Sequence, residues 1–191
     1  MSVSTDPPDS LETYRDKRDF RRSSEPSGKS PRQQGERPIF VIQQHDARRM
    51  HFDFRLEVDG VLKSWAVPKG PSTDPSDKRL AVHVEDHPLD YADFEGVVPE
   101  DEYGGGTVIV WDAGPYRNIK TDDDGREMSM ADALDLGTVE VFLEGRKLKG
   151  GYALIHSKMG GDEQNWLLVK MKDDHADARR NPVSTEPRSV L

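Results

Sequence analysis

The chain contains no cysteine, which excludes a disulfide framework and any metal site built from thiolates. It also lacks an apolar run of about 18 residues, the length that a membrane-spanning helix needs, and a charged-then-apolar leader. The sequence therefore predicts neither a membrane protein nor a secreted one. We expect a cytoplasmic protein.

Apolar residues are scarce, at 34% of 191 positions, and they are unevenly distributed. Residues 1–37 and 173–191 are rich in proline, serine and charge, and segments of this composition cannot offset the entropy lost on ordering. The sequence predicts one folded domain over residues 38–172. An N-terminal helix and flexible segment over 1–37 would precede it, and a disordered tail over 173–191 would follow.

The net charge of -9 argues against bulk electrostatic binding of nucleic acid, which normally needs a basic surface. A local basic site remains compatible with this charge, and we expect it to bind a nucleic-acid end weakly and in a salt-sensitive way. The basic residues gather in three groups: Lys17, Arg18, Arg21 and Arg22; Arg48 and Arg49; Lys69, Lys78 and Arg79.

Short runs of β-type residues dominate the pattern between residues 38 and 172. The Asp59-Gly60 pair between two of them predicts a two-residue hairpin turn. Short helices are predicted at Ser10–Phe20 and Ser129–Leu136. The expected strands are 39–43, 51–58, 61–67, 79–85, 107–111, 138–143, 150–157 and 165–171. This spacing indicates an all-β fold, an antiparallel β-barrel or closed sandwich with one or two short flanking helices.

The run from residue 51 to residue 58 alternates polar and apolar side chains. In a strand, His51, Asp53 and Arg55 share one face, while the apolar residues between them face a core. His45, six residues upstream, can add a third ligand. Two imidazoles and a carboxylate suit manganese, iron, cobalt or zinc, and an arginine beside them suits a phosphate. The alternative is a polar strand face with a structural histidine, and Arg55 in a structural salt bridge.

Two further motifs point to the same region. His87 precedes Pro88 at the end of an expected strand, a position for a general acid or a hydrogen-bond donor to a phosphate. His83, four residues earlier, would lie on the same face of that strand. The glycine-rich run from Tyr103 to Gly106 lacks the Gly-Lys-Ser/Thr ending of a nucleotide-binding loop and opens a strand. It therefore predicts a tight turn with close backbone approach.

Four motifs, in order, resemble the 3′-phosphoesterase domain of bacterial DNA ligase D, the end-processing module of bacterial non-homologous end joining. They are HDARRMHFDFRLEVDGVLKSW from His45, WAVPKGPS at Trp65–Ser72, RLAVHVEDHPLDYADFEG at Arg79–Gly96 and EYGGGTVIVWDAG at Glu102–Gly114. The resemblance covers about residues 11–172. It implies a β-barrel with a helix or two outside, and His45, His51 and Asp53 as ligands of Mn²⁺, with Co²⁺ or Zn²⁺ as other candidate metals.

The resemblance also implies roles for residues that composition alone leaves open. Arg55 and His87 would contact the phosphate in catalysis, with Lys69, Arg79 and Tyr91 beside them. Arg18, Asp19 and Glu25 match residues that the nuclease step needs, and Gln43 matches a polar residue of the site. By residue type alone, Lys69 and Arg79 are also compatible with surface charge, Tyr91 with a core position, and the N-terminal residues with a disordered tail.

The implied activity is a metal-dependent 3′-end-healing phosphoesterase, which removes 3′-terminal ribonucleosides and then 3′-phosphates from primer–template ends. No ligase Lys-x-Asp-Gly signature or polymerase motif is present, so the sequence predicts a stand-alone, monomeric module. Separate ligase, polymerase or Ku-type proteins would be its partners. Two alternatives remain: a non-catalytic module that binds DNA ends, and an iron-dependent oxygenase whose triad would be His51, Asp53 and His156.

Overall fold

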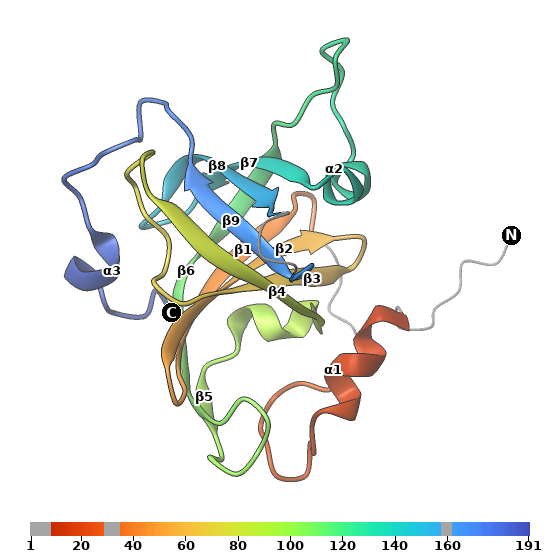
Figure 1. Ribbon diagram of the computed structural model, residues 1–191. Coiled ribbons are helices and arrows are strands. Elements are labelled where there is room, and N and C mark those ends of the chain that lie inside the picture. Colours follow the sequence, from red (N-terminus) through yellow and green to blue (C-terminus); the bar gives the residue numbers. More distant parts are fainter. Residues whose placement is uncertain (1–8, 29–34, 158–161) are drawn as a thin grey trace, which may run out of the picture.

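The computed structural model describes residues 9–28, 35–157 and 162–191, which form one antiparallel sheet of nine strands (Figure 1). The strands are β1 (Ile39–Asp46), β2 (Met50–Val58), β3 (Val61–Val67), β4 (Lys78–Pro88), β5 (Gly96–Val98), β6 (Gly106–Asn118), β7 (Thr138–Glu144), β8 (Lys149–His156) and β9 (Asn165–Lys170). Their order is β1-β2-β3-β4-β9-β8-β7-β6-β5, and β1 also pairs with β6.

The β1–β6 pairing closes eight strands into a barrel, to which the short β5 adds a ninth at the edge of β6. The long β6 makes closure possible because its first part pairs with β1 and its last residues pair with β7. All eight strands that the sequence predicts are present, and Asp59 and Gly60 form the expected turn with φ angles of 50° and 85°. The prediction of an antiparallel β-barrel is confirmed.

The helices are short and lie outside the barrel: 3₁₀ helix η1 (Asp9–Leu11), α1 (Glu12–Asp16), 3₁₀ helix η2 (Leu89–Asp93), α2 (Met130–Leu136) and α3 (Pro182–Thr185) (Figure 1). The expected helix before residue 137 is confirmed. Ser129 caps α2 by accepting a hydrogen bond from the Asp132 amide, and Gly137 ends it with φ of 87°. The N-terminal helix ends at Asp16, earlier than predicted. No helix in the described ranges is long and apolar enough to cross a membrane.

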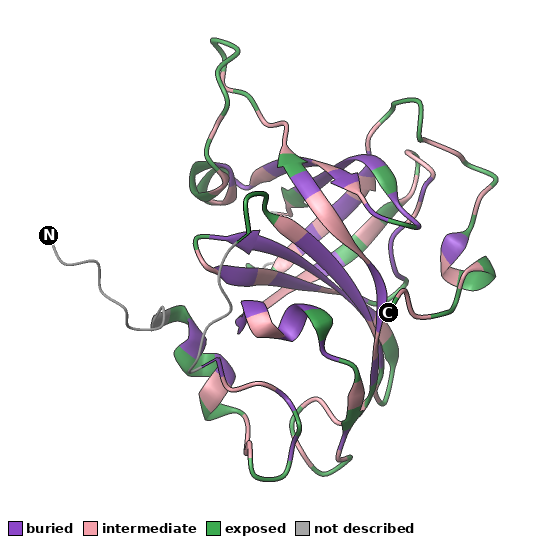
Figure 2. Cartoon of the chain, turned by 180° about the vertical axis from the view of Figure 1, so that it is seen from behind, coloured by how far each residue is buried: buried purple, intermediate pink, exposed green. Residues whose placement is uncertain are grey.

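Two apolar clusters divide the molecule. The larger fills the barrel and includes Phe54 and Trp65, and Figure 2 shows how continuously the strands around it are buried. The smaller lies on the outer face of β1, β3 and β6, where Tyr14 of α1 and Tyr91 of η2 pack over the sheet. The outer face of these strands is thus partly covered. A polar site can form there with its floor on rigid strands.

The C-terminal segment differs from the predicted disordered tail. Within residues 173–191, the Glu186 carbonyl accepts hydrogen bonds from Trp111 Nε1 at 2.9 Å and Lys147 Nζ at 2.8 Å, and the Val190 amide donates to Val110. These contacts use backbone groups of a segment with little apolar periodicity. Composition therefore gave no sign of them, and the segment packs against the barrel.

Candidate active site

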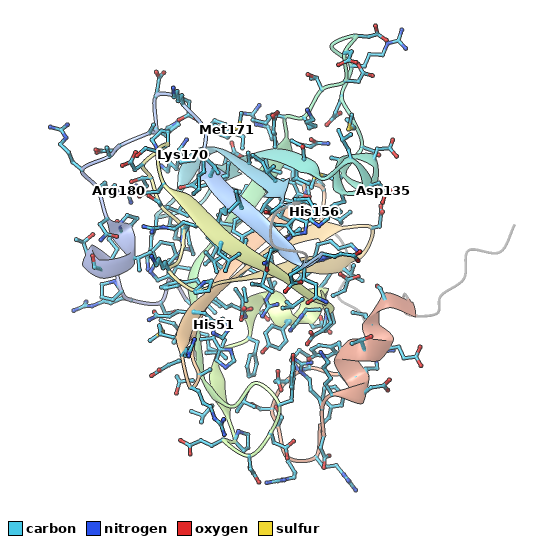
Figure 3. The ribbon with its side chains drawn as sticks, viewed as in Figure 1. His51, Asp135, His156, Lys170, Met171 and Arg180 are labelled. Carbon is cyan, nitrogen blue, oxygen red and sulfur yellow. The ribbon has the colours of Figure 1, made fainter. Side chains whose placement is uncertain are left out.

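The first two strands bring the proposed metal ligands together. Antiparallel pairing places His45 opposite His51 and Gln43 opposite Asp53, so the three candidate ligands share the outer face of the barrel. The intervening Phe52 points into the interior core, as its parity predicts. His51 appears below the centre of the molecule in Figure 3.

The three ligands are close enough to share one ion. One ligand atom from each of His45, His51 and Asp53 lies within 4.8 Å of the others. His51 Nε2 is 3.3 Å from an Asp53 oxygen, and His45 Nδ1 is 3.8 Å from the other. His51 Nδ1 lies 3.1 Å from the Arg49 carbonyl oxygen, which fixes its proton there and leaves Nε2 free. Buried His45 Nε2 has no hydrogen-bond partner. This group can hold a metal.

Electrostatics favour the protonation states that a metal needs. Burial lowers the pKa of His45, which keeps this ring neutral. Burial opposes ionisation of Asp53, but the charge of Arg55 and the neighbouring histidines lower its pKa overall. Burial acts to lower the pKa of His51, while Asp53 raises it overall, so an incoming cation must displace a proton from His51 more often than from His45.

Arg55 is buried next to the triad on β2. Its Nε donates to Gln43 Oε1 at 2.7 Å, and one terminal nitrogen donates to Asp53 at 3.2 Å. Its guanidinium also lies over the Tyr91 ring, 4.9 Å from the ring centre. The other terminal nitrogen is buried and has no partner. A fixed cation with an unused donor is suited to binding a phosphate oxygen.

Gln43, which the resemblance matches to a polar residue of the site, supports Arg55. Its Nε2 donates to the carbonyls of Tyr91 at 2.8 Å and Phe94 at 3.0 Å, while its oxygen accepts from Arg55. Both N–H groups of the amide are therefore engaged, and the side chain is fully buried. The structure makes Gln43 a link between β1, η2 and Arg55.

His87 reaches the site through an irregularity in β4. Leu62 pairs with His87 while Ser64 pairs with Val84, so β4 holds one extra residue between these pairs. As a result, both Val84 and His87 line the cavity although they differ in parity. His87 Nδ1 donates to the Glu85 carbonyl at 2.9 Å.

The His87 ring is neutral. Burial, followed by the charges of Arg55 and Arg18, holds its pKa well below the ordinary value of 6.5. Its Nε2 lies 3.3 Å from an Arg18 terminal nitrogen, from which it accepts a hydrogen bond. In this state His87 carries no proton on the nitrogen that faces the cavity.

The N-terminal segment completes the opposite wall. Arg18 Nε and the Tyr91 hydroxyl both donate to one oxygen of Glu25, at 3.0 and 2.9 Å, and the Ser23 hydroxyl donates to the other at 2.9 Å. Burial, with Glu25 nearby, raises the pKa of Tyr91 well above 10, so its hydroxyl stays protonated. Part of the segment predicted to be flexible thus packs against the barrel. Residues 29–34 lie outside the described residues.

These groups surround one cavity of about 220 Å³. Of the sequence-predicted site residues, the ones that line it are Arg18, Glu25, His45, His51, Asp53, Arg55, His87 and Tyr91. Glu85 and Tyr103 also line it, although neither was assigned a role in the site. Glu85 accepts from Lys17 at 3.3 Å and Arg18 at 3.4 Å.

Besides Gln43, which lies behind Arg55, three predicted residues are not brought to the cavity. Asp19 forms an ion pair with the exposed Arg21, and neither residue lines the cavity. Lys69 is exposed in the turn after β3. Arg79 pairs across strands with Leu168 of the interior core, so it lies on the other face of the sheet. The geometry therefore gives no support to direct contact between these three side chains and a ligand in the cavity.

Comparisons with known proteins identify the family of this chain. Residues 43–156 match the DNA Ligase D 3'-phosphoesterase domain. The chain is 50% identical over 184 residues to the multifunctional non-homologous end joining protein LigD of Pseudomonas aeruginosa, covering 95% of this chain and 21% of that protein. It is 46% identical over 165 residues to the LigD repair protein of Mycobacterium tuberculosis, covering 86% of this chain and 20% of that protein.

The chain spans about one fifth of the length of these relatives. The matched family region contains the second half of β1 and all of β2 and β4, and with them the metal group, Arg55 and His87. The chain belongs to the DNA ligase D 3′-phosphoesterase domain family.

Proposed function

We propose that this protein is a metal-dependent 3′-end-healing phosphoesterase that removes 3′-terminal ribonucleosides and 3′-phosphates from primer ends in double-strand-break repair. One observation carries the proposal. Two buried polar atoms without partners, His45 Nε2 and an Arg55 terminal nitrogen, belong to residues that line the same cavity as Asp53. A metal ion and a phosphate oxygen are the ligands that such atoms suit.

We propose Mn²⁺ as the metal, held by His45, His51 and Asp53. The family resemblance supports manganese, while imidazole and carboxylate donors also accommodate Co²⁺ or Zn²⁺. A bound divalent ion would polarise the phosphorus centre and neutralise charge on the phosphate oxygens. The low pKa of Asp53 and the neutral His45 ring prepare the site for a cation.

The remaining residues would act on the phosphate and the leaving group. Arg55 binds a non-bridging oxygen through its unused nitrogen and stabilises the charge that develops in the transition state. His87 is neutral before binding. The negative charge of a bound phosphate beside it favours protonation of the ring, because opposite charge raises a histidine pKa. His87 then donates this proton to the departing oxygen.

The substrate is nucleic acid, and the binding of an end depends on few charges. The chain carries a net charge of -9, so binding relies on the local cations around the cavity. The names of the relatives place them in non-homologous end joining, and we propose the same process for this chain. Separate ligase, polymerase or Ku-type proteins would meet it there.

The alternatives gain less support. An oxygenase triad would need His156 beside His51 and Asp53, but His156 is on β8, where its ring packs on Trp166. A non-catalytic module that binds ends would need a donor for the phosphate, but no group beside it that can hold a metal. The candidate metal group next to Arg55 favours a catalytic site.

The test is a primer–template assay with Mn²⁺ and products resolved at single-nucleotide length. In the family a neighbouring 2′-hydroxyl assists the first step. The primer therefore carries two 3′-terminal ribonucleotides, because the 2′-hydroxyl next to the scissile phosphate belongs to the penultimate sugar. We expect shortening by one nucleoside to a 3′-phosphate, followed by conversion to a 3′-hydroxyl. Binding of the primer without any cleavage would support the end-binding module instead.

A further inference from the structure

Two neighbouring hollows share lining residues with the cavity. On the α1 side, a hollow of about 590 Å³ shares Glu85 and Tyr103 with the cavity. On the side of the β1–β2 hairpin, a hollow of about 490 Å³ shares His51 and Gly104 with it. The scissile phosphate at the centre would have one flank of the substrate in each hollow.

The charges of the two hollows differ. On the α1 side, Lys17 pairs with Glu85 at 3.3 Å, and Lys63 pairs with Asp86 at 2.9 Å. These four charges cancel in pairs. The α1-side hollow is therefore suited to an uncharged group.

The hairpin side keeps positive charge available. Arg48 and Arg49 are exposed, and neither guanidinium is in an ion pair within the described part of the chain. Of the acids there, Glu102 is bound by Arg22 at 2.6 Å, which leaves Glu100. The net charge of this hollow is positive, which suits the phosphates of a nucleic-acid strand.

Tyr103 stands between the cavity and the α1-side hollow. Its side chain is large and apolar, and the residue is 46% exposed. The Lys17 ammonium donates to its hydroxyl at 3.3 Å and lies 4.8 Å from its ring centre, and the Arg18 guanidinium is 5.3 Å from the same centre. Two cations thus hold the ring in place.

The backbone beside Tyr103 is fixed by the glycine-rich turn. A Cβ on Gly105 would lie 2.6 Å from the Pro99 carbonyl, and Gly104 and Gly106 have φ angles of 75° and 134°. These positions require glycine, which confirms the close backbone approach that the sequence predicts. A fixed, half-exposed aromatic ring at a nucleic-acid site is suited to stacking against a base of any sequence.

Building on the proposed function, we propose that Tyr103 holds the nucleobase of the departing 3′-terminal nucleoside, and that the primer strand runs over Arg48 and Arg49. In the diester step, the oxygen of water bonds to phosphorus and the bond from phosphorus to the 5′-oxygen breaks. The attacking water loses one proton and the 5′-oxygen gains one, so the nucleoside leaves as an alcohol and the primer keeps the 3′-phosphate. The leaving nucleoside is uncharged, which matches the paired charges of the α1-side hollow. The strand that remains is anionic.

The experiment measures KM and kcat for wild type and for Tyr103→Ala, Tyr103→Phe and Tyr103→Trp on three primer–templates. One ends in two ribonucleotides, the second has an abasic terminal ribose, and the third ends in a 3′-phosphate. For Tyr103→Ala we expect KM of the first to rise roughly 5- to 100-fold, the range for one lost base stack, with kcat changed less. Tyr103→Phe and Tyr103→Trp should keep KM near the wild-type value, because both retain an aromatic ring. Leu80→Ala, another exposed apolar residue, is the matched control.

The abasic and 3′-phosphate primers separate stacking from support of the fold. Removal of the base should raise the KM of wild type about as much as Tyr103→Ala raises it on the primer with two ribonucleotides. For the Tyr103→Ala variant, removal of the base should raise KM no further. The 3′-phosphate primer should be hydrolysed by Tyr103→Ala as by wild type. Equal loss on all three primers, or no loss on any, would overturn the assignment of Tyr103.

The strand direction has its own variant. The double change Arg48→Ala with Arg49→Ala should raise KM for all three primers and flatten its dependence on salt, with Arg126→Ala as the control. A loss confined to the primer with two ribonucleotides would reverse the proposed direction. If wild type cleaves no primer, the proposed function fails and this inference with it. If wild type cleaves them and Tyr103→Ala matches it, only this inference fails.

Discussion

The two walls of the cavity are built in different ways. His45, His51, Asp53 and Arg55 come from two adjacent strands, and the backbone ladder of β1 and β2 sets their spacing. The opposite wall comes from residues 9–28, which contribute no strand. We call these the strand wall and the N-terminal wall. The strand wall carries the groups for a metal and a phosphate, which both proposed steps need.

The N-terminal wall is held by side chains. Arg18 alone donates to Glu25, to the Tyr14 carbonyl and to Glu85, and its guanidinium lies 4.0 Å from the Tyr14 ring centre. The Tyr14 hydroxyl donates to the Pro26 carbonyl, which folds the segment back on itself. A wall held by side-chain contacts can change its shape more easily than one held by backbone hydrogen bonds between strands. It is suited to a group present in only one step, the leaving nucleoside.

The largest expected effect is on the strand wall. Asp53→Asn removes the only carboxylate of the triad while it keeps the side-chain volume, so metal binding and both activities should be lost. We expect a fall in kcat of about 10³-fold or more on both the diester and 3′-phosphate primers. Metal content and turnover are measured together. His156→Ala, an imidazole outside the cavity, should change neither, and a metal-loaded, active Asp53→Asn protein would contradict the triad.

Arg55→Ala should lower kcat about 10²-fold on both primers, because one transition-state donor is lost. The change also leaves Gln43 Oε1 and the buried Asp53 without their donor, so unfolding should become easier by about 2–4 kcal/mol. Activity is therefore expressed per folded molecule. Arg55→Lys should not restore it, since an ammonium cannot reproduce the fork. A fall in kcat on only one of the two primers would contradict the claim that Arg55 binds the phosphate in both steps.

The N-terminal wall should respond selectively. Arg18→Ala removes contacts to Glu25, Glu85 and His87, so the diester step should fall about 10- to 100-fold while the 3′-phosphate step changes less than about threefold. Both rates are measured on the same protein. Arg21→Ala, whose side chain is 91% exposed, is the matched control. Equal loss of the two steps would erase the distinction between the walls.

The smallest effect concerns acid stability. The folded pKa of His87 is far below its unfolded value of about 6.5, so the unfolded chain binds more protons between these values. Stability contributed by neutral His87 is present above about pH 6.5 and lost as pH falls below it. His87→Gln should lessen the drop in melting temperature from pH 7.5 to 5.5, measured with a chelator. His45 and His83 keep their own low pKa values in both proteins. An unchanged drop would contradict the buried, neutral ring.

The sequence predicts the strand wall well because strand periodicity is local. His51 and Asp53 are two residues apart, and one hairpin brings His45 opposite them. The missed strand β5 is only three residues long, too short to show alternation. The expectation that His83 and His87 share one face of β4 is wrong. The extra residue in β4 turns His87 toward the cavity and leaves His83 stacked on Trp65.

The N-terminal wall could not be predicted by pattern. Glu25 is placed by Arg18, Ser23 and Tyr91, and its contact with Tyr91 joins residues 66 positions apart. Such contacts leave no period in the sequence. The resemblance to the family identified Arg18 and Glu25, whereas composition alone indicated a flexible segment. For the same reason the contacts of the C-terminal segment, which use backbone carbonyls, were not foreseen.

The central claim is that one metal ion and one phosphate share the strand wall. The most direct measurement is a crystal structure with Mn²⁺ and inorganic phosphate, with the metal located by anomalous scattering. We expect one manganese peak bonded to the His45 ring, His51 Nε2 and Asp53, and a phosphate oxygen on the unused nitrogen of Arg55. Manganese bound elsewhere, or a phosphate that does not contact Arg55, would contradict the account.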